Sequence, residues 1–209
     1  MKRLEILVEE PSCEEAFHHL LPLILPRGVR YNVRSFQGKN DLLHKLPKRL
    51  DGYKRLPDFD ELRIVVLIDR DREDCTALKQ KLEKISHEKG FVTRTRAKNS
   101  AVYQIANRIA IEELEAWFLG DFDAVINAYP ELKRNSSRLR RRKEFTNPDS
   151  VEGGTWEALE KLLQRAGYYS SGLQKLDAAR KISQLMQPDR NISPSFILFR
   201  DTLREIVKQ

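Results

Sequence analysis

A continuous apolar run near the middle of the chain ends in two acidic residues. Residues 64–68 are all isoleucine, valine or leucine, and Asp69 and Asp71 follow the run. An uninterrupted apolar run of this length is typical of a central parallel strand that is buried on both faces. Carboxylates at the end of a buried strand are costly to desolvate unless a cation lies between them. The pattern therefore predicts an α/β fold with a divalent-metal site at the end of this strand.

Strands and helices alternate along the first half of the chain. We expect strands at residues 4–8, 31–36 and 64–68, and the residues after each of them carry apolar side chains at helical spacing. Two further extended stretches are expected around residues 91–95 and 103–111. Ser12 and Asp74 each occupy a position typical of a helix N-cap. Alternation of this kind predicts a mainly parallel sheet with helices on both faces.

The composition changes after about residue 121. Arginine and lysine crowd a polar stretch at residues 134–143, and helical patterns follow at residues 156–163, 173–186 and 196–207. No low-complexity linker or internal repeat interrupts the chain. We interpret residues 1–125 as an α/β domain and residues 126–209 as a helical extension packed on it.

Overall charge and cysteine content favour a protein with a polyanionic partner and argue against a disulfide-rich protein. The 38 Lys and Arg residues exceed the 31 Asp and Glu residues, and the net charge of +7 favours a polyanionic partner such as nucleic acid. Cys13 and Cys75 are too few for a disulfide framework, and the four histidines show no zinc-ligand spacing with them. There is no signal-peptide pattern, and no apolar run approaches the ~20 residues of a membrane span. We therefore expect a cytoplasmic protein without a membrane partner.

A further acid follows the first predicted strand. Glu9 comes directly after residues 4–8, and Glu10 could take its place in the register. Open parallel sheets bind their ligands beyond the carboxyl ends of the strands, where Glu9, Asp69 and Asp71 would all lie. Carboxylate oxygens of this kind suit Mg²⁺, which keeps several waters and takes further ligands from substrate phosphate. The strand order that would make these residues neighbours is not determined by the sequence.

Other acids near the predicted strand ends are candidates for a second ion. Glu113 and Glu115 would be its first ligands, although acids at the start of a helix are equally expected to stabilise the helix dipole. Glu14 and Asp74 stand behind them, and a helix cap is the better interpretation of Asp74.

Basic and aromatic residues allow two interpretations each. Lys39 or Lys98 would offset charge on a pentavalent phosphoryl transition state. The basic run at residues 134–143 would either hold a phosphate backbone or form a solvated loop or a docking face for an acidic partner. Its lack of interleaved aromatic residues argues against base stacking on a single strand. Trp117 and Phe118 are expected in the core.

Five ordered blocks of the sequence carry a resemblance to a known family. They are Glu-Glu-Pro-Ser at 9–12, Gln-Gly-Lys at 37–39, Asp-Arg-Asp at 69–71, Glu-Glu-Leu-Glu-Ala-Trp at 112–117 and Asn-Ile-Ser-Pro-Ser-Phe at 191–196. The chain resembles the Toprim domain shared by topoisomerases, bacterial primases, ribosomal RNA maturases and the overcoming-lysogenization-defect nucleases. It is more closely similar to an uncharacterised Toprim-like family, domain of unknown function family 4276. One position departs from the Toprim pattern, because Glu10 stands where those proteins usually have glycine.

The resemblance implies a Toprim-like catalytic domain at residues 1–125 and a Mg²⁺- or Mn²⁺-dependent nuclease that acts on DNA or RNA. It also implies a partner ATPase of the ABC or AAA type in a phage-defence system. The residues implied as catalytic are Glu9, Asp69, Asp71, Glu113 and Lys39, and those implied as metal ligands are Glu9, Asp69, Asp71, Glu113 and Glu115.

Two other functions fit the same residues. A non-catalytic effector or regulatory subunit would use the fold to dock on an ATPase, and a primase-like enzyme would add nucleotides on a template. The sequence has no Gly-rich phosphate loop of the Walker type, so any ATP hydrolysis would come from a partner. A chain this short, without an evident tyrosine-bearing cleavage domain, is not expected to be a complete topoisomerase.

Overall fold

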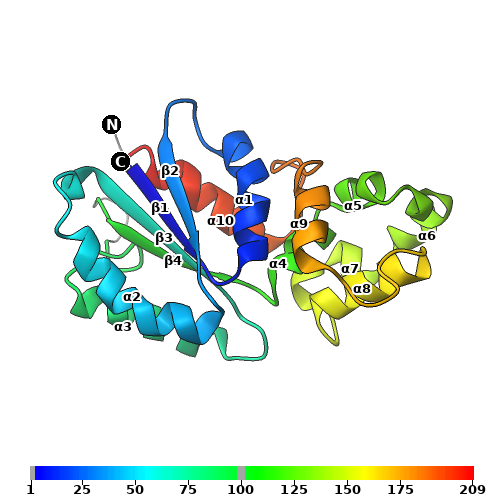
Figure 1. Ribbon diagram of the computed structural model, residues 1–209, viewed down its shortest axis with the longest axis horizontal. Coiled ribbons are helices and arrows are strands. Elements are labelled where there is room, and N and C mark those ends of the chain that lie inside the picture. Colours follow the sequence, from blue (N-terminus) through cyan, green and yellow to red (C-terminus); the bar gives the residue numbers. More distant parts are fainter. Residues whose placement is uncertain (1–2, 98–101) are drawn as a thin grey trace.

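A computed structural model describes residues 3–97 and 102–209 of the chain (Figure 1). Within these residues, four strands form one all-parallel sheet in the order β2-β1-β3-β4. The strands are β1 (Arg3–Val8), β2 (Arg30–Ser35), β3 (Leu62–Asp69) and β4 (Ile105–Ala110). The predicted α/β fold with a parallel sheet is therefore confirmed.

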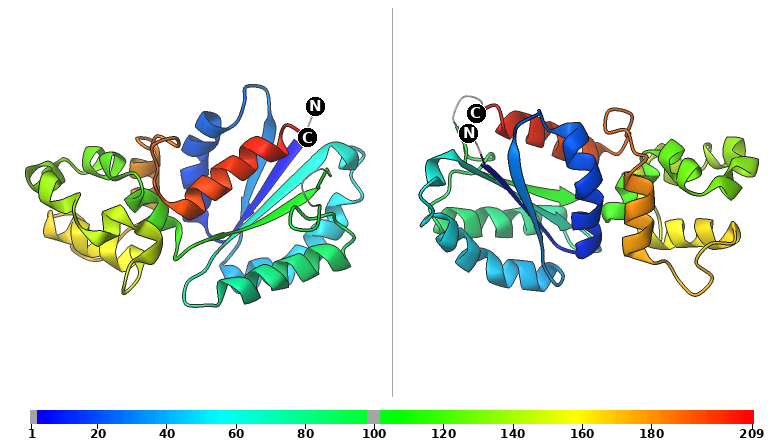
Figure 2. Two further views of the ribbon diagram at one scale, coloured as in Figure 1. Left: turned by 180° about the vertical axis from the view of Figure 1, so that it is seen from behind. Right: turned by 45° about the horizontal axis from the view of Figure 1, so that its top comes forward.

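Helices cover both faces of the sheet. α1 (Pro11–Ile24) and α10 (Pro194–Ile206) lie on one face, and α2 (Lys39–Tyr53) and α3 (Cys75–Glu88) lie on the other (Figure 2). A short 3₁₀ helix, η1 (Phe59–Glu61), precedes β3. Helices on both faces explain why β3 reads as an unbroken apolar run, since both of its faces need apolar side chains.

Successive residues of β3 point into different cores. Ile64, Val66 and Ile68 join the cluster under α2 and α3, whereas Val65 and Leu67 join the cluster under α1 and α10. All five are at most 2% exposed. The alternation follows from the period of two along a strand, and it places the end of β3 deep between the two helical layers.

The helix starts include one confirmed and one wrong prediction. Asp74 caps α3 as predicted, because its Oδ1 accepts a hydrogen bond from the Ala77 N–H at 2.7 Å. Ser12 is not the cap of α1, which begins at Pro11 with Glu10 in the N-cap position. Proline has the backbone φ of a helix and no N–H to satisfy, so it suits the first helical position and moves the start one residue earlier.

The extended stretch expected around residues 91–95 forms a bridge to β4 but not a full strand. Thr93 forms a single bridge with Ile105, and the chain then turns as the Arg96 and Ala97 N–H groups both donate to the Thr93 carbonyl oxygen. Phe91 and Thr93 are buried while Val92 is exposed, which produces a strand-like alternation without a ladder. β4 itself is shorter than the predicted 103–111.

The remaining helices form a lobe beyond the carboxyl ends of the strands, at the right of Figure 1. They are α4 (Leu114–Leu119), α5 (Phe122–Ala128), η3 (Pro130–Asn135), α6 (Ser136–Leu139), α7 (Lys143–Thr146), η4 (Pro148–Ser150), α8 (Thr155–Arg165) and α9 (Lys175–Ser183). None of the helices in the described part of the chain combines the length and hydropathy that crossing a membrane requires.

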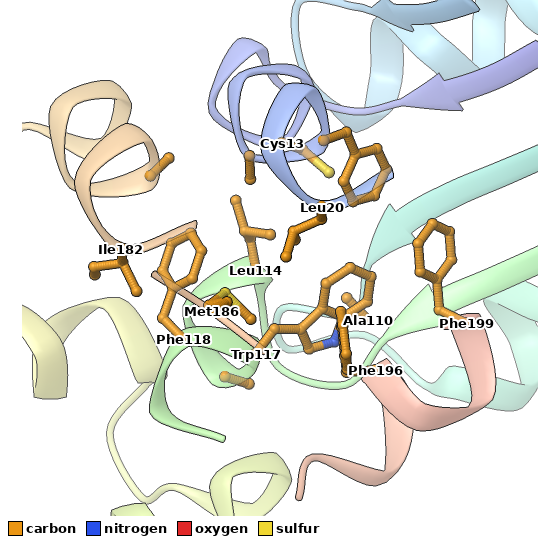
Figure 3. Packing of buried hydrophobic residues seen from close by; sticks show 14 of the residues in the cluster. Cys13, Leu20, Ala110, Leu114, Trp117, Phe118, Ile182, Met186, Phe196 and Phe199 are labelled. Atoms are coloured by element: carbon orange, nitrogen blue, oxygen red, sulfur yellow. The ribbon is translucent and has the colours of Figure 1, made fainter. Parts of the chain in front are cut away.

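Trp117 of α4 lies at the junction of the lobe and the sheet, as Figure 3 shows. It is fully buried, and its ring centroid lies 5.0 Å from that of Phe199 and 5.2 Å from that of Phe196, both on α10. Its indole N–H donates to Ser195 Oγ at 2.9 Å, so the polar edge of the ring is satisfied. Trp117 and Phe118 are core residues, as the sequence predicted.

Candidate functional site

The strand order brings the first and third strand ends together. β1 and β3 are adjacent, and Val8 pairs with Leu67. The helices that follow these two strands leave toward opposite faces of the sheet, α1 to one face and α3 to the other. Such a switch point leaves a crevice beyond the carboxyl ends of the strands, which is the usual ligand site of parallel α/β folds.

Glu9 and Asp69 meet at this switch point. The Asp69 N–H donates to Glu9 Oε2 at 3.1 Å, and the Glu9 residue is 8% exposed. The loop after β2 holds the Glu9 backbone, because the Gly38 N–H donates to the Glu9 carbonyl oxygen at 3.1 Å. Gly38 has a φ of +91°, a conformation that favours glycine, and the next residue is Lys39.

The Asp69 carboxylate forms no direct contact with a cation in the described part of the chain, although Lys175 is near enough to interact with it electrostatically. Among residues 3–97 and 102–209, no side chain donates a hydrogen bond to it or forms an ion pair with it. Burial raises the pKa of Asp69 well above its ordinary value, and the nearby carboxylates of Glu9 and Glu115 raise it further. An unpaired acid in this position is the kind of group that a bound cation would stabilise.

Glu115 is the second acid of this kind. It lies on α4, is 3% exposed, and has its pKa raised to about 7, mainly by burial. Lys175 lowers this pKa, whereas Glu113 and Glu10 raise it. Glu115 thus contributes a deeply buried carboxyl group close to Asp69.

Cys13 shares the same surroundings on α1. Burial raises the pKa of its thiol well above the ordinary value, and the charges of Asp69, Glu10 and Glu115 add to the effect. The thiol therefore stays protonated at neutral pH, so Cys13 acts here as a small apolar residue.

Asp71 lies at the open side of the site and is paired with lysine. Lys39 Nζ is 2.6 Å from Asp71 Oδ2 and 2.9 Å from Glu73 Oε1. Burial lowers the pKa of Lys39, but the hydrogen bonds to these two acids outweigh burial and raise it overall. Asp71 has a φ of +51°, and its N–H donates to the Glu112 carbonyl oxygen at 3.0 Å. The predicted lysine thus lies at the site, as the ion-pair partner of one of the predicted ligands.

Lys175 is a site residue that sequence reasoning missed. It is the first residue of α9, lies 3.9 Å from Glu10 Oε2, and stacks over the Trp156 ring at 5.7 Å. Burial lowers the pKa of Lys175, but the acids around it, led by Glu115, raise it overall. Nothing in its local sequence marks it, because only the folded chain brings α9 to the strand ends.

Three other candidate acids have structural partners. Glu113 Oε2 accepts hydrogen bonds from Thr155 Oγ1 and the Trp156 N–H, both at 3.2 Å, at the start of α8. Glu14 accepts hydrogen bonds from the backbone N–H and the hydroxyl of Ser35. Asp74 is exposed and caps α3. Lys98 lies outside the described residues.

The acids of the site are of the chemical type that binds divalent cations, but their side chains are not arranged as a preformed metal site. Glu9, Asp69 and Glu115 offer hard carboxylate oxygens, and none of the three forms an ion pair within the described residues. In the described part of the chain, however, no three His, Cys, Asp or Glu side chains already converge as a metal-binding group. A cation would have to draw these side chains closer together.

The fold and the site together define the protein as an open parallel α/β protein with an acidic site at the switch point of its sheet. The chain belongs to the family described as Domain of unknown function (DUF4276), whose sequence profile matches residues 8–204. No curated protein and no solved structure gives a significant match.

Proposed function

We propose that this protein is a Toprim-like, Mg²⁺- or Mn²⁺-dependent nuclease that hydrolyses phosphodiester bonds of DNA or RNA. The observation that carries the proposal is the Asp69 carboxylate, which ends a buried strand beside Glu9 and Glu115 and forms no ion pair or hydrogen bond with a side chain of the described residues. An acid in this setting destabilises the protein when no cation is bound, so its presence at the strand ends favours a role in binding.

Glu9, Asp69 and Glu115 would hold the ion, with Asp71 at the open side. When bound, Mg²⁺ polarises a phosphoryl oxygen and lowers the pKa of a coordinated water. Asp71 is available to the ion only if Lys39 moves to Glu73, which already accepts from it at 2.9 Å. The pairing of Lys39 with both acids makes that exchange a small movement.

Two lysines from different helices supply positive charge to the acids. Lys39 comes from the start of α2, and Lys175 comes from the start of α9. The raised pKa of each keeps it protonated at neutral pH. A substrate phosphate placed between them would have its transition-state charge offset by fixed cations.

A partner ATPase and a role in phage defence belong to the same proposal, and their support is the resemblance to the Toprim nucleases. The second candidate is a non-catalytic subunit that docks on an ATPase. One observation favours it, because Lys39 already neutralises Asp71 and would make a stable site without metal.

Cleavage of DNA and RNA pools tests the nuclease directly. The wild type is compared with Asp69→Asn and with the control Asp74→Asn, which keeps a good N-cap on the exposed start of α3. We expect cleavage with Mg²⁺ or Mn²⁺, none in EDTA, a loss of roughly 10²–10³-fold in Asp69→Asn and full activity in the control. Cleavage that persists in EDTA or in Asp69→Asn would contradict the proposal. Wild type that binds metal but cuts neither pool would favour the docking subunit.

A further inference from the structure

A basic groove runs along α8 in the helical lobe. Two adjoining cavities of about 740 and 290 Å³ share Arg142, Leu162 and Arg165 as lining residues. We define the arginine groove by its six basic lining residues, Arg134, Arg138, Arg142, Lys143, Lys161 and Arg165. The groove lies between η3 with α6 on one side and α8 on the other, and α6 lies at the far end of the lobe from the sheet (Figure 1).

Positive charge exceeds negative charge in the arginine groove. Its acidic lining residues are Glu131, Glu144 and Glu152, and each of them is engaged by one basic residue, namely Arg134, Arg142 and Lys143. Arg138, Lys161 and Arg165 form no ion pair with any side chain in the described ranges, and all three are exposed. Three cations are thus left to meet an external anion.

The groove connects to the acidic site through α8. Gly153 and Gly154 line its near end, and the next two residues donate hydrogen bonds to Glu113. From residue 154 to Arg165 the helix rises roughly 17 Å. The arginine groove therefore begins beside the acids at the strand ends and leads away from them.

The lining chemistry selects a phosphate backbone. Guanidinium groups match phosphate oxygens in a bidentate geometry, and four of the six basic residues are arginine. No aromatic residue is among the lining residues, so bases have no surface on which to stack. A length of roughly 17 Å spans about five phosphates of one strand at 3.4 Å each.

We propose that the arginine groove binds the sugar-phosphate backbone of a nucleic acid without reading its sequence, and that it directs the strand toward the acidic site. The second part rests on the proposed nuclease function, whereas the first part stands without it. Residues 134–143 supply only one wall, and Lys161 and Arg165 of α8 supply the other.

Fluorescence anisotropy in EDTA tests the binding without any cleavage. A labelled 20-nucleotide strand and a 20-base-pair duplex, each in two unrelated sequences, are titrated with wild type between 50 and 200 mM KCl. The groove variant is Arg138→Gln with Arg165→Gln. The matched control is Lys48→Gln with Arg49→Gln, which removes the same charge from two exposed residues of α2.

For the groove variant we expect about tenfold weaker binding at 100 mM KCl and a salt slope shallower by roughly 1.4–1.8, corresponding to two lost phosphate contacts. Lys161→Gln removes one phosphate contact, so its salt slope should change by about half as much as that of the groove variant. The control should bind as the wild type does, and the two sequences should bind equally. Absence of wild-type binding at 50 mM KCl, equal weakening of the groove variant and the control, or a strong sequence preference would overturn the proposal. If the groove fails this test while Asp69-dependent cleavage persists, only the groove proposal is overturned. If the groove binds nucleic acid but nothing is cleaved, only the nuclease proposal is contradicted.

Discussion

The Glu9 side chain accepts a hydrogen bond from the backbone N–H of Asp69 at 3.1 Å, which ties the ends of two neighbouring parallel strands together. Burial raises the pKa of Glu9, and this hydrogen bond and Lys39 partly offset the effect. Burial alone would favour the neutral acid form of Glu9. The hydrogen bond from Asp69 favours the carboxylate and holds it in place.

Glu9→Gln separates the structural role of this residue from its charge. Glutamine keeps an oxygen that can accept from the Asp69 N–H, so we expect the free energy of unfolding in urea to change by less than about 1 kcal/mol. Metal affinity should nevertheless fall, because the anionic ligand is gone. A large loss of stability with unchanged metal affinity would show that Glu9 is structural only.

Glu115→Gln should stabilise the metal-free protein at alkaline pH. Because the pKa of Glu115 rises from 4.5 to about 7 in the folded state, the folded protein holds the proton more tightly and loses stability as pH rises through that range. At pH 8 ionisation costs the folded state about 3 kcal/mol, which the uncharged glutamine avoids. Urea unfolding in EDTA at pH 5 and pH 8 measures the difference, which should be small at pH 5 and large at pH 8. Equal stabilities at pH 8 would contradict a buried carboxylate that Lys175 compensates only in part.

Glu5→Gln should have the opposite effect. Glu5 is fully buried in β1 and accepts hydrogen bonds from the side chains of Arg3, Asn32, Arg34 and Tyr53 at 2.8–3.1 Å. Burial raises its pKa, but these hydrogen bonds outweigh burial and lower it overall. The charged group therefore stabilises the fold above its ordinary pKa of 4.5, and this stability is lost as pH falls through the lowered value.

We expect Glu5→Gln to cost about 2–3 kcal/mol at pH 7, since the arginines are partly exposed and can regain water. Urea unfolding of both proteins at pH 7 and pH 3 checks this, and the gap should narrow at pH 3. A constant gap at both pH values would mean that the charge is not the stabilising element.

Glu113→Gln should affect α8 and leave the metal site intact. Its carboxylate caps the start of α8 through Thr155 and Trp156, so loss of the charge should cost about 1 kcal/mol of unfolding free energy. Calorimetry should show the same Mg²⁺ affinity as wild type. A loss of Mg²⁺ affinity as large as that of Asp69→Asn would show that Glu113 is a metal ligand and that capping α8 is not its main role.

Local patterns predicted the sheet elements and the two acids at the end of β3, because burial on both faces and helix capping act through neighbouring residues. The position of Glu9 beside Asp69 depends on β1 pairing with β3, which is a contact across some sixty residues of chain. Lys175 reaches the site from still farther away. No short-range rule determines such pairings.

Two local expectations differ from the structure, each for a physical reason. At Ser12, the fixed φ of Pro11 outweighs the side-chain capping preference. At residues 91–95, burial of Phe91 and Thr93 beside β4 gives the alternation of a strand, but the backbone turns after Thr93. An alternating pattern of apolar residues indicates which side chains are buried. A strand also needs a neighbouring strand with which to form a ladder of hydrogen bonds.

Calorimetric titration with Mg²⁺ and Mn²⁺ tests the central claim, that the acids at the ends of β1 and β3 form a divalent-cation site. Wild type is compared with Glu9→Gln, Asp69→Asn, Asp71→Asn and Glu115→Gln, with Asp74→Asn as the control. We predict binding in wild type and control, loss in the Glu9, Asp69 and Glu115 variants, and weaker binding in the Asp71 variant, whose acid is shared with Lys39. Metal affinity that is unchanged in Asp69→Asn would contradict the account.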